Sequence, residues 1–312
     1  MMTAYHAELI PRSPFSFDLT CQAMAAHTGG PVALDTYEGG VFRRVLSRDG
    51  RALLVSARSE GSVDRPRLMV EVWGDAVEPD DAKWASGWIR HLLATDEDLA
   101  AFYDAVGGDP TLGKVLARLH GLSPGRAATV FEALVLSIIG QQIAATVARL
   151  IRADLLQVYG TPVRRDGATY YGFPGAETLL AAGTDGLRKL RLSQRKAEYI
   201  LGICEGVGTG TLDLEGMASL TREEVVGRLV RVRGIGPWTA EWVLGRALGR
   251  LDAFPAGDLA LQRTLSRLYG DGRSLSERET ADMGRRWEGY QGLVVTYLFA
   301  ALRLRLLDEI QA

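Results

Sequence analysis

One aspartate in the second half of the chain has the type and setting that could do chemistry. Asp258 follows the non-helical stretch Phe-Pro-Ala-Gly and precedes the helix-periodic segment LALQRTLSRLYG. A fixed carboxylate can stabilise positive charge that develops on a reacting group. An aspartate here is also a favoured helix N-cap, and that role would explain the residue by itself. The two roles can coexist.

A pair of tryptophans lies about twenty residues before this aspartate. Trp238 and Trp242 stand four residues apart in PWTAEWVLGRALG, so their rings share one face of the expected helix. Electron-rich rings attract flat and cationic ligands by stacking and cation–π contact. Core packing, which explains most aromatic pairs at this spacing, is the alternative. Glu241 points to another face of the helix, where we expect a solvated charge.

The residues before the tryptophans, VRGIG, predict a tight turn between two helices, the first spanning residues 221–232. Pro237 suits the first turn of the second helix. Gly234 and Gly236 permit backbone angles closed to other residues and let a ligand approach the main chain. Because the helix start also presents unpaired N–H groups, the turn predicts an anion-binding site, or anion seat. Ile235 is expected to be the apolar residue, or apolar pin, that packs the turn against its own helices. A helical hairpin without a ligand is the alternative.

The first third of the chain predicts a small antiparallel sheet. The strand-like segments VFRRVLS and RALLVSARS flank an Asp-Gly turn signal at residues 49–50, and RLMVEVW alternates at period two. The segment after Pro79 repeats apolar residues at Trp84, Trp88 and Leu92, a helical spacing that would cover one face of the sheet. These patterns predict a sheet domain over residues 1–108.

Beyond Asp109 the strand signal nearly vanishes and helix-period segments follow one another, at residues 112–119, 130–138, 144–159 and 194–205. Thr221 with Glu224, and Ser276 with Glu279, have the spacing of capping boxes at helix starts. The fold class is therefore predicted as mixed α+β, with the sheet and its covering helices followed by a mostly α-helical body.

Charge and cysteine content limit the classes of function. The net charge of −2 is uneven, since residues 1–108 carry 10 Lys and Arg against 16 Asp and Glu, whereas residues 109–312 carry 26 against 22. A polyanion is therefore expected to bind the second part. Two cysteines and four scattered histidines give no disulfide framework, iron–sulfur site or metal-ligand spacing. Without a signal peptide or an uninterrupted apolar span, we expect a cytoplasmic protein with no membrane partner.

Two motifs in order, LVRVRGIGPWTAEWVL and then FPAGDLALQR, carry a family resemblance. With SIIGQQIAATVARLI upstream, the chain resembles the helix-hairpin-helix (HhH-GPD) DNA glycosylases, most of all the DNA-3-methyladenine glycosylase II type. The resemblance implies a two-lobed helical core. Residues 109–126 and 251–312 would form the lobe that closes the active-site cleft, and residues 127–250 the lobe that carries the hairpin, at about 221–249.

The resemblance also implies roles for single residues. Asp258 matches the catalytic aspartate, and Leu259 stands in the pocket where an aromatic residue is expected. Trp238, Trp242 and Phe299 match aromatic residues of the base pocket. Gln142, or its neighbour Gln141, matches the residue that fills the gap left by a flipped base. The expected backbone contacts are Arg233, Gly234, Ile235, Gly236 and Thr239, with Na⁺ or K⁺ at carbonyls near Val232 and Ile235.

The function implied is that of a monofunctional DNA glycosylase in base excision repair, which hydrolyses the N-glycosidic bond of 3-methyladenine, 7-methylguanine and related purines in double-stranded DNA. Enzymes that also cut the strand use a lysine where this chain has Trp238, so no lyase step is expected. We expect a monomer with no required cofactor, associated with the nucleoid in a bacterium. The alternatives are a glycosylase for oxidised or mismatched bases and a non-catalytic DNA-binding protein.

Overall fold

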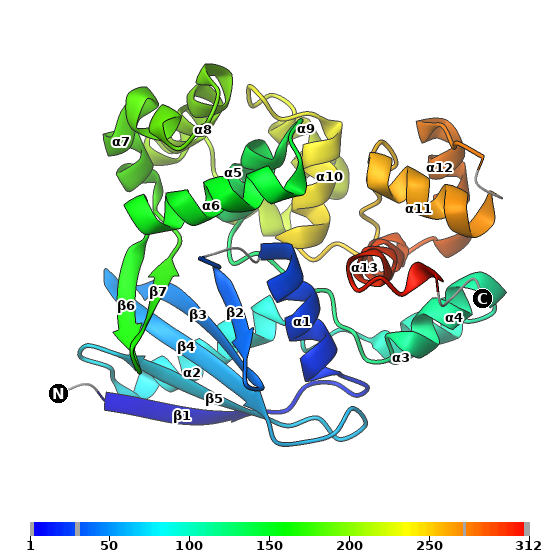
Figure 1. Cartoon of the computed structure of the whole chain (residues 1–312), viewed down its shortest axis with the longest axis horizontal. Helices are drawn as coiled ribbons and strands as arrows, with labels where there is room; N and C mark the ends of the chain where they lie inside the picture. Colours follow the sequence, from blue (N-terminus) through cyan, green and yellow to red (C-terminus); the bar gives the residue numbers. More distant parts are fainter. Residues whose placement is uncertain (1–2, 29–31, 271–272, 309–312) are drawn as a thin grey trace.

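The computed structural model describes residues 3–28, 32–270 and 273–308. A sheet lies on one side, and two helical lobes lie beyond it (Figure 1). The fold class predicted from the sequence, mixed α+β, is confirmed. In the described part of the chain, no helix has the length and apolar character needed to cross a membrane.

The sheet has seven strands in the order β1-β5-β4-β3-β7-β6, with β2 paired to β3. All pairings are antiparallel except the one between β3 and β7. The strands are β1 (Thr3–Leu9), β2 (Asp35–Glu38), β3 (Val41–Arg48), β4 (Arg51–Ser59), β5 (Leu68–Gly74), β6 (Thr161–Arg165) and β7 (Ala168–Gly172).

Two of these strands contradict the expectation of an almost strand-free second part. The hairpin β6–β7 descends from the helical body to the sheet and extends it beyond β3 (Figure 1). Its turn, Asp166-Gly167, has positive φ at both residues. This is the same Asp-Gly signal that marks the turn between β3 and β4, so the sequence did carry evidence for the hairpin.

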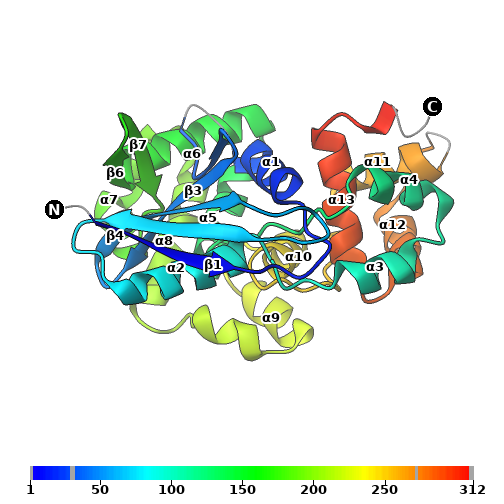
Figure 2. The same cartoon turned by 90° about the horizontal axis from the view of Figure 1, so that it is seen from below.

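Two helices accompany the sheet, α1 (Phe17–Thr28) and α2 (Pro79–Leu92). Helix α2 covers one face (Figure 2), as expected, but of the three predicted apolar residues only Leu92 is fully buried. Its buried positions include Ala82, Ala85, Ile89 and Leu92, whereas the two tryptophans of α2 are only half-buried. The small alanines let the helix lie close to the strands, while the larger rings pack at its edge.

The remaining helices form the two lobes. They are α3 (Leu99–Val106), α4 (Pro110–Arg118), α5 (Val130–Gly140), α6 (Ala145–Tyr159), α7 (Ala176–Lys189), α8 (Gln194–Gly208), α9 (Arg222–Leu229), α10 (Pro237–Arg246), α11 (Leu259–Tyr269), α12 (Glu277–Gly284) and α13 (Gln291–Arg303), with short 3₁₀ helices η1 (Glu215–Ser219) and η2 (Arg285–Trp287). Both predicted capping boxes are present, at the starts of α9 and α12.

Three large buried clusters fill the molecule. One lies under the sheet, one unites α5, α8, α9 and α10, and one unites α3 and α4 with α11 and α13. Helix α3 therefore packs with the carboxyl-terminal lobe, although its residues fall within the 1–108 segment assigned to the sheet domain from the sequence. Leu99 and Phe102 of α3, which belong to this lobe's core, are almost fully buried.

Candidate functional site

Asp258 occupies the N-cap of α11, between the two helical lobes. Its Oδ1 accepts hydrogen bonds from the backbone N–H groups of Ala260 (2.8 Å) and Leu261 (3.0 Å). Its Oδ2 accepts from the indole Nε1–H of Trp238 at 2.8 Å. The N-cap role is therefore real, and it coexists with a side-chain contact to the first tryptophan of the predicted pair. Three donors fix the carboxylate in one orientation.

The loop that leads into Asp258 is held by Glu241, which corrects the expectation of a solvated charge. One carboxylate oxygen of Glu241 pairs with Arg222 of α9, and the other accepts from the backbone N–H of Phe254 at 3.0 Å. Burial raises the pKa of Glu241 above its usual range. Because its partners come from α9 and from a later loop, spacing along α10 alone could not reveal them. Glu241 thus positions the segment before the candidate catalytic residue.

The three predicted pocket aromatics lie together. The rings of Trp238 and Trp242 meet edge to face, with centroids 6.0 Å apart and an interplanar angle of 66°. Trp242 and Phe299 are stacked, with centroids 5.8 Å apart and an angle of 16°. The guanidinium of Arg303 lies 5.6 Å from the centre of the Phe299 ring. Phe299 is 6% exposed and part of a core, so its packing role is also real.

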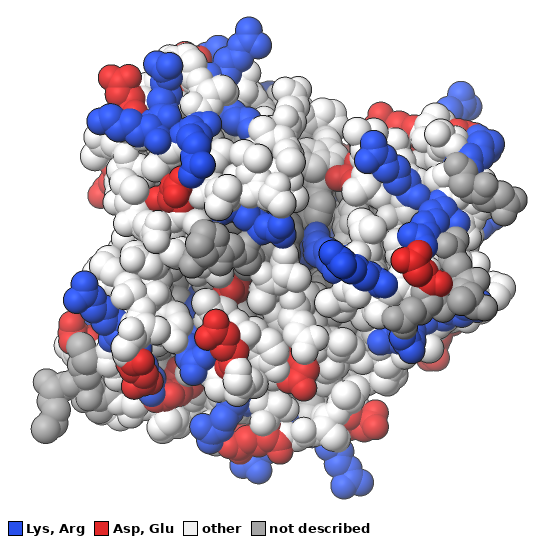
Figure 3. All heavy atoms as spheres, in the orientation of Figure 1, with Lys and Arg blue, Asp and Glu red and all other residues white. Residues whose placement is uncertain are grey.

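A small cavity of about 50 Å³ opens beside the stacked rings, between α10 and α13. Trp242 and Phe299 line it, together with Arg246 and Arg303, whereas Asp258 and Trp238 do not. The cavity therefore adjoins the aromatic site at Trp242 and Phe299. The surface is hollowed between the two lobes, with Lys and Arg side chains along the hollow (Figure 3).

Arg246 and Arg303, two of the three arginines that line the cavity, were missed in the sequence. Burial, together with the nearby charge of Arg246, lowers the pKa of Arg303 to about 9, while the charge of Asp258 opposes the shift. Burial likewise lowers the pKa of Arg246 to about 10. Within the described ranges neither guanidinium forms a salt bridge with a carboxylate. Both remain cations at neutral pH, so the deep end of the site carries positive charge.

Leu259 is the first residue of α11, directly after Asp258, and it is 65% exposed. It does not line the small cavity, and neither do Asp258 and Trp238. Its place in the base pocket stays a prediction.

The predicted hairpin between α9 and α10 is present, and α9 ends at Leu229, three residues earlier than expected. Only Gly234 has positive φ, at 91°, and a Cβ there would overlap the ring of Tyr199. Gly236 has φ −101°, and a Cβ there would meet nothing within 4 Å. Gly234 is thus required by the packing of the hairpin against Tyr199, while Gly236 leaves open space at the start of α10. Ile235 is 5% exposed and packs in the core, as expected of an apolar pin.

Arg233 and Thr239, both predicted to contact the DNA backbone, differ in exposure. Arg233 is exposed at the hairpin and forms an ion pair with Glu198 at 3.3 Å. Thr239 is only 2% exposed, so its side chain faces the protein interior. Its hydroxyl accepts a hydrogen bond from the Gln141 amide at 3.4 Å. The Thr239 side chain therefore supports the hairpin from inside, and a contact of this residue with the DNA backbone stays a prediction.

The break between α5 and α6 is also where the sequence placed it, but its two glutamines differ. The Gln141 amide Nε2 donates to the carbonyl of Gly234 at 3.0 Å, so this side chain faces the hairpin and not the solvent. Gln142 is exposed and has φ 55°, a left-handed conformation. Of the two wedge candidates, only Gln142 projects outward.

Comparison with known proteins gives the family. The model of the "HhH-GPD superfamily base excision DNA repair protein" matches residues 135–288. A Bacillus subtilis protein named "Putative DNA-3-methyladenine glycosylase YfjP" is 30% identical over 299 residues, which are 93% of this chain and 96% of the relative. The chain belongs to the HhH-GPD superfamily. The family resemblance predicted from the two motifs is thus confirmed.

Two further relatives in the HhH-GPD superfamily agree with this placement. The "DNA-3-methyladenine glycosylase" of Bacillus subtilis is 29% identical over 215 residues, covering 69% of this chain and 71% of the relative. The solved structure of the 3-methyladenine DNA glycosylase from Archaeoglobus fulgidus is similar with a TM-score of 0.84 and 31% identity, covering 96% of this chain and 99% of that one. The similarity to this HhH-GPD structure spans the sheet as well as both lobes.

Proposed function

We propose that this protein is a DNA glycosylase that removes alkylated purines, chiefly 3-methyladenine and 7-methylguanine, from double-stranded DNA in base excision repair. The observation that carries the proposal is the Asp258 carboxylate, fixed by three N–H donors beside stacked aromatic rings. Membership of a base excision repair family supports it. So do relatives whose names specify 3-methyladenine.

The carboxylate suits a reaction that builds positive charge on a sugar. When the bond between C1′ and the purine nitrogen breaks, its electron pair leaves with the base and the sugar acquires oxocarbenium character. An ionised carboxylate stabilises that charge. A carboxylate has about four lone-pair sites, and Asp258 uses three of them within the protein. The remaining site on Oδ2 is available to the sugar or to the water that adds to C1′.

An alkylated purine leaves without help from a dedicated acid. Alkylation at a ring nitrogen makes the base cationic before the bond breaks, so the departing base is neutral. Water then adds to C1′ and gives up its proton, which leaves an abasic site. The aromatic rings of Trp238 and Trp242 bind such a cation by stacking and cation–π contact. This chemistry needs no lysine nucleophile, and we propose that the enzyme has no strand-cutting activity.

The elements around the site suit a flipped nucleotide. The start of α10 offers backbone N–H groups next to Gly236, where no side chain blocks a phosphate. We propose that Gln142, which is exposed at the joint between α5 and α6, fills the gap left in the duplex. Arg233 would contact the DNA backbone near the hairpin.

A monovalent cation, Na⁺ or K⁺, fits the same hairpin through backbone carbonyls near Val232 and Ile235. The Val232 carbonyl accepts the N–H of Ile235 at 3.0 Å, which leaves its second lone pair for an ion. Such an ion supplies positive charge beside a bound phosphate. Cys21 and Cys204 are buried in separate cores and do not approach each other as cluster ligands would. We propose that no other cofactor is needed and that the protein acts as a monomer.

The test is a base-release profile. Purified protein is incubated with methylated duplex DNA, the released bases are identified by mass spectrometry, and the strands are analysed before and after alkali treatment. The proposal expects 3-methyladenine and 7-methylguanine, with strands that break only after alkali. Release of oxidised bases alone would support a glycosylase of another specificity. DNA binding without release of any base would favour a non-catalytic binding protein, and sedimentation of the same sample tests the monomer.

A further inference from the structure

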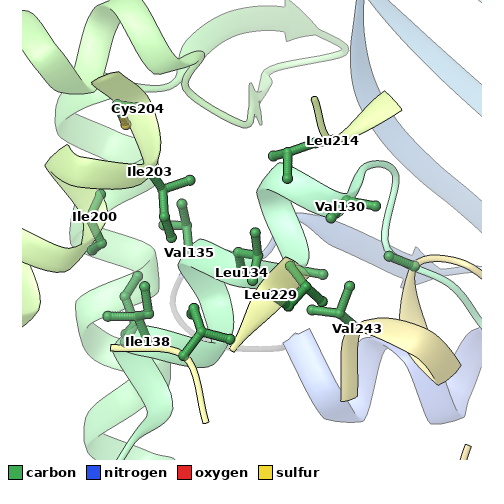
Figure 4. Packing of buried hydrophobic residues seen from close by; sticks show 14 of the residues in the cluster. Val130, Leu134, Val135, Ile138, Ile200, Ile203, Cys204, Leu214, Leu229 and Val243 are labelled. Carbon is green, nitrogen blue, oxygen red and sulfur yellow. The ribbon is translucent and has the colours of Figure 1, made fainter. Parts of the chain in front are cut away.

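Helix α8 contacts both parts of the molecule that are proposed to act on DNA. Its buried residues Ile200 and Ile203 face α5 in the core, where Ile203 lies close to Val135 (Figure 4). One turn away, Lys196 reaches the end of α5, and Tyr199 lies against the hairpin. One helix thus links the joint that carries Gln142 to the turn that offers the phosphate seat.

Lys196 fixes the end of α5. Its Nζ donates to the carbonyls of Ile139 (2.9 Å) and Gln141 (2.6 Å), two of the three that directly precede Gln142. A helix end leaves such carbonyls without intrahelical partners, and a cation there is favoured by the helix dipole. Burial lowers the pKa of the Lys196 ammonium, in keeping with its place against the backbone. Two short bonds from one ammonium therefore hold the backbone on the amino-terminal side of Gln142.

The joint is held on both sides of Gln142. Gln142 itself is in the left-handed region with φ 55°, a conformation that a residue with a side chain adopts only when its surroundings enforce it. On its carboxyl-terminal side Ile143 packs against the core of the hairpin lobe. On its amino-terminal side, the Gln141 carbonyl accepts from Lys196 and the Gln141 amide donates to the hairpin, so these bonds contribute to the orientation of Gln142.

The hairpin is tied to the same unit. The Gln141 amide donates to the Gly234 carbonyl at 3.0 Å, and the Tyr199 ring packs on Gly234, which leaves no space for a Cβ. Arg233 lies with its guanidinium 5.5 Å from the centre of the Tyr199 ring. The distance between the phosphate seat and Gln142 is therefore set by contacts that run through α8 and the Gln141 amide.

We propose that Lys196 is a positioning residue for base flipping, which holds Gln142 in register with the hairpin so that gripping the backbone and filling the gap occur together. This inference rests on the proposed glycosylase function and on Gln142 as the inserting residue. Lys196 does not touch DNA or the reacting atoms in this account. A displacement of about 1 Å at a positioning contact can cost about 100-fold in rate, so its loss is expected to be large where flipping is required.

The experiment compares one lesion in two settings. Single-turnover release of the same alkylated purine is measured from duplex DNA and from the single strand, in which no partner base has to be replaced. For Lys196→Met the duplex rate is expected to fall about 10- to 100-fold, while the single-strand rate changes by less than about threefold. Lys196→Arg, which keeps a cationic donor, is expected to recover part of the duplex rate. Lys189→Met, an exposed lysine of α7, is the matched control.

A double-mutant cycle with Gln142→Ala separates positioning from general damage. If Lys196 acts through Gln142, then Lys196→Met lowers the duplex rate in the wild-type background but adds little in the Gln142→Ala background. Equal losses on duplex and single strand, or losses that multiply in the cycle, would overturn the inference and show a structural role. An unchanged duplex rate would overturn it as well. Failure of the wild-type protein to release any base would refute the proposed function itself, which is a distinct result.

Discussion

Removing one hydrogen-bond donor tests how the carboxylate is held. Trp238→Phe keeps an aromatic ring in place but deletes the indole N–H that donates to Asp258 Oδ2 at 2.8 Å. The two backbone donors to Oδ1 remain, so α11 keeps its cap. The variant therefore keeps the Asp258 carboxylate but loosens its orientation.

The expected decrease in the rate of base release follows from the hydrogen bond that is lost. A hydrogen bond to a charged group contributes about 1.5–3 kcal/mol, and each 1.36 kcal/mol of activation free energy is about tenfold in rate. Only the part of this energy that differs between bound substrate and transition state affects the rate. Because the backbone donors still hold Oδ1, we expect the lower end, a decrease of about tenfold in the rate of base release.

The assay is single-turnover release of an alkylated purine from duplex DNA, with the dissociation constant measured separately by fluorescence anisotropy. Trp88→Phe, the same substitution in the sheet domain, is the control and should leave the rate unchanged. We expect Trp238→Phe to alter the rate and to leave DNA affinity nearly as it is. A variant that releases bases at the wild-type rate would refute the idea that Trp238 orients Asp258.

Three further variants test other parts of the site. Gly236→Ala should weaken DNA binding, because the added Cβ would stand where the phosphate is proposed to bind. It should lower the free energy of unfolding by at most about 1 kcal/mol, because the Cβ meets open space in the protein. Unchanged affinity for DNA would argue against a phosphate site at the start of α10. Arg303→Leu should raise the rate of release of cationic 7-methylguanine about tenfold relative to the rate for a neutral purine lesion. The reason is that the Arg303 cation repels a cationic base by about 1–2 kcal/mol. An unchanged ratio of the two rates would show that Arg303 does not interact with the bound base. Glu241→Gln should lower the free energy of unfolding by about 1 kcal/mol, because the largely buried Glu241 loses the charge that pairs with the partly exposed Arg222. An unchanged midpoint in a urea titration would contradict this.

The parts of the site that the sequence predicted are those encoded locally. The cap at Asp258, the turn at Gly234 and the pairing of Trp238 with Trp242 all follow from residues within a few positions of one another. Local signals of this kind depend on backbone geometry, which neighbouring residues determine.

The parts that were missed depend on long-range packing. The partners of Glu241 come from α9 and from the loop at Phe254, and its pairing appears only when these segments meet. Arg303 is an ordinary residue in the last turn of α13 until burial against Phe299 gives it a place in the cavity. The strands β6 and β7 carried a turn signal, but their pairing with β3 joins residues more than a hundred positions apart.

The most direct measurement replaces the candidate catalytic carboxylate with an amide. Asp258→Asn keeps a favoured N-cap residue but removes the negative charge. Asp109→Asn is a matched control, because Asp109 caps α4 through two backbone N–H groups in the same way. We predict that Asp258→Asn binds alkylated duplex DNA but releases bases about 100- to 1000-fold more slowly, whereas Asp109→Asn retains the wild-type rate. Base release by Asp258→Asn at a rate near that of the wild-type protein would contradict the central claim.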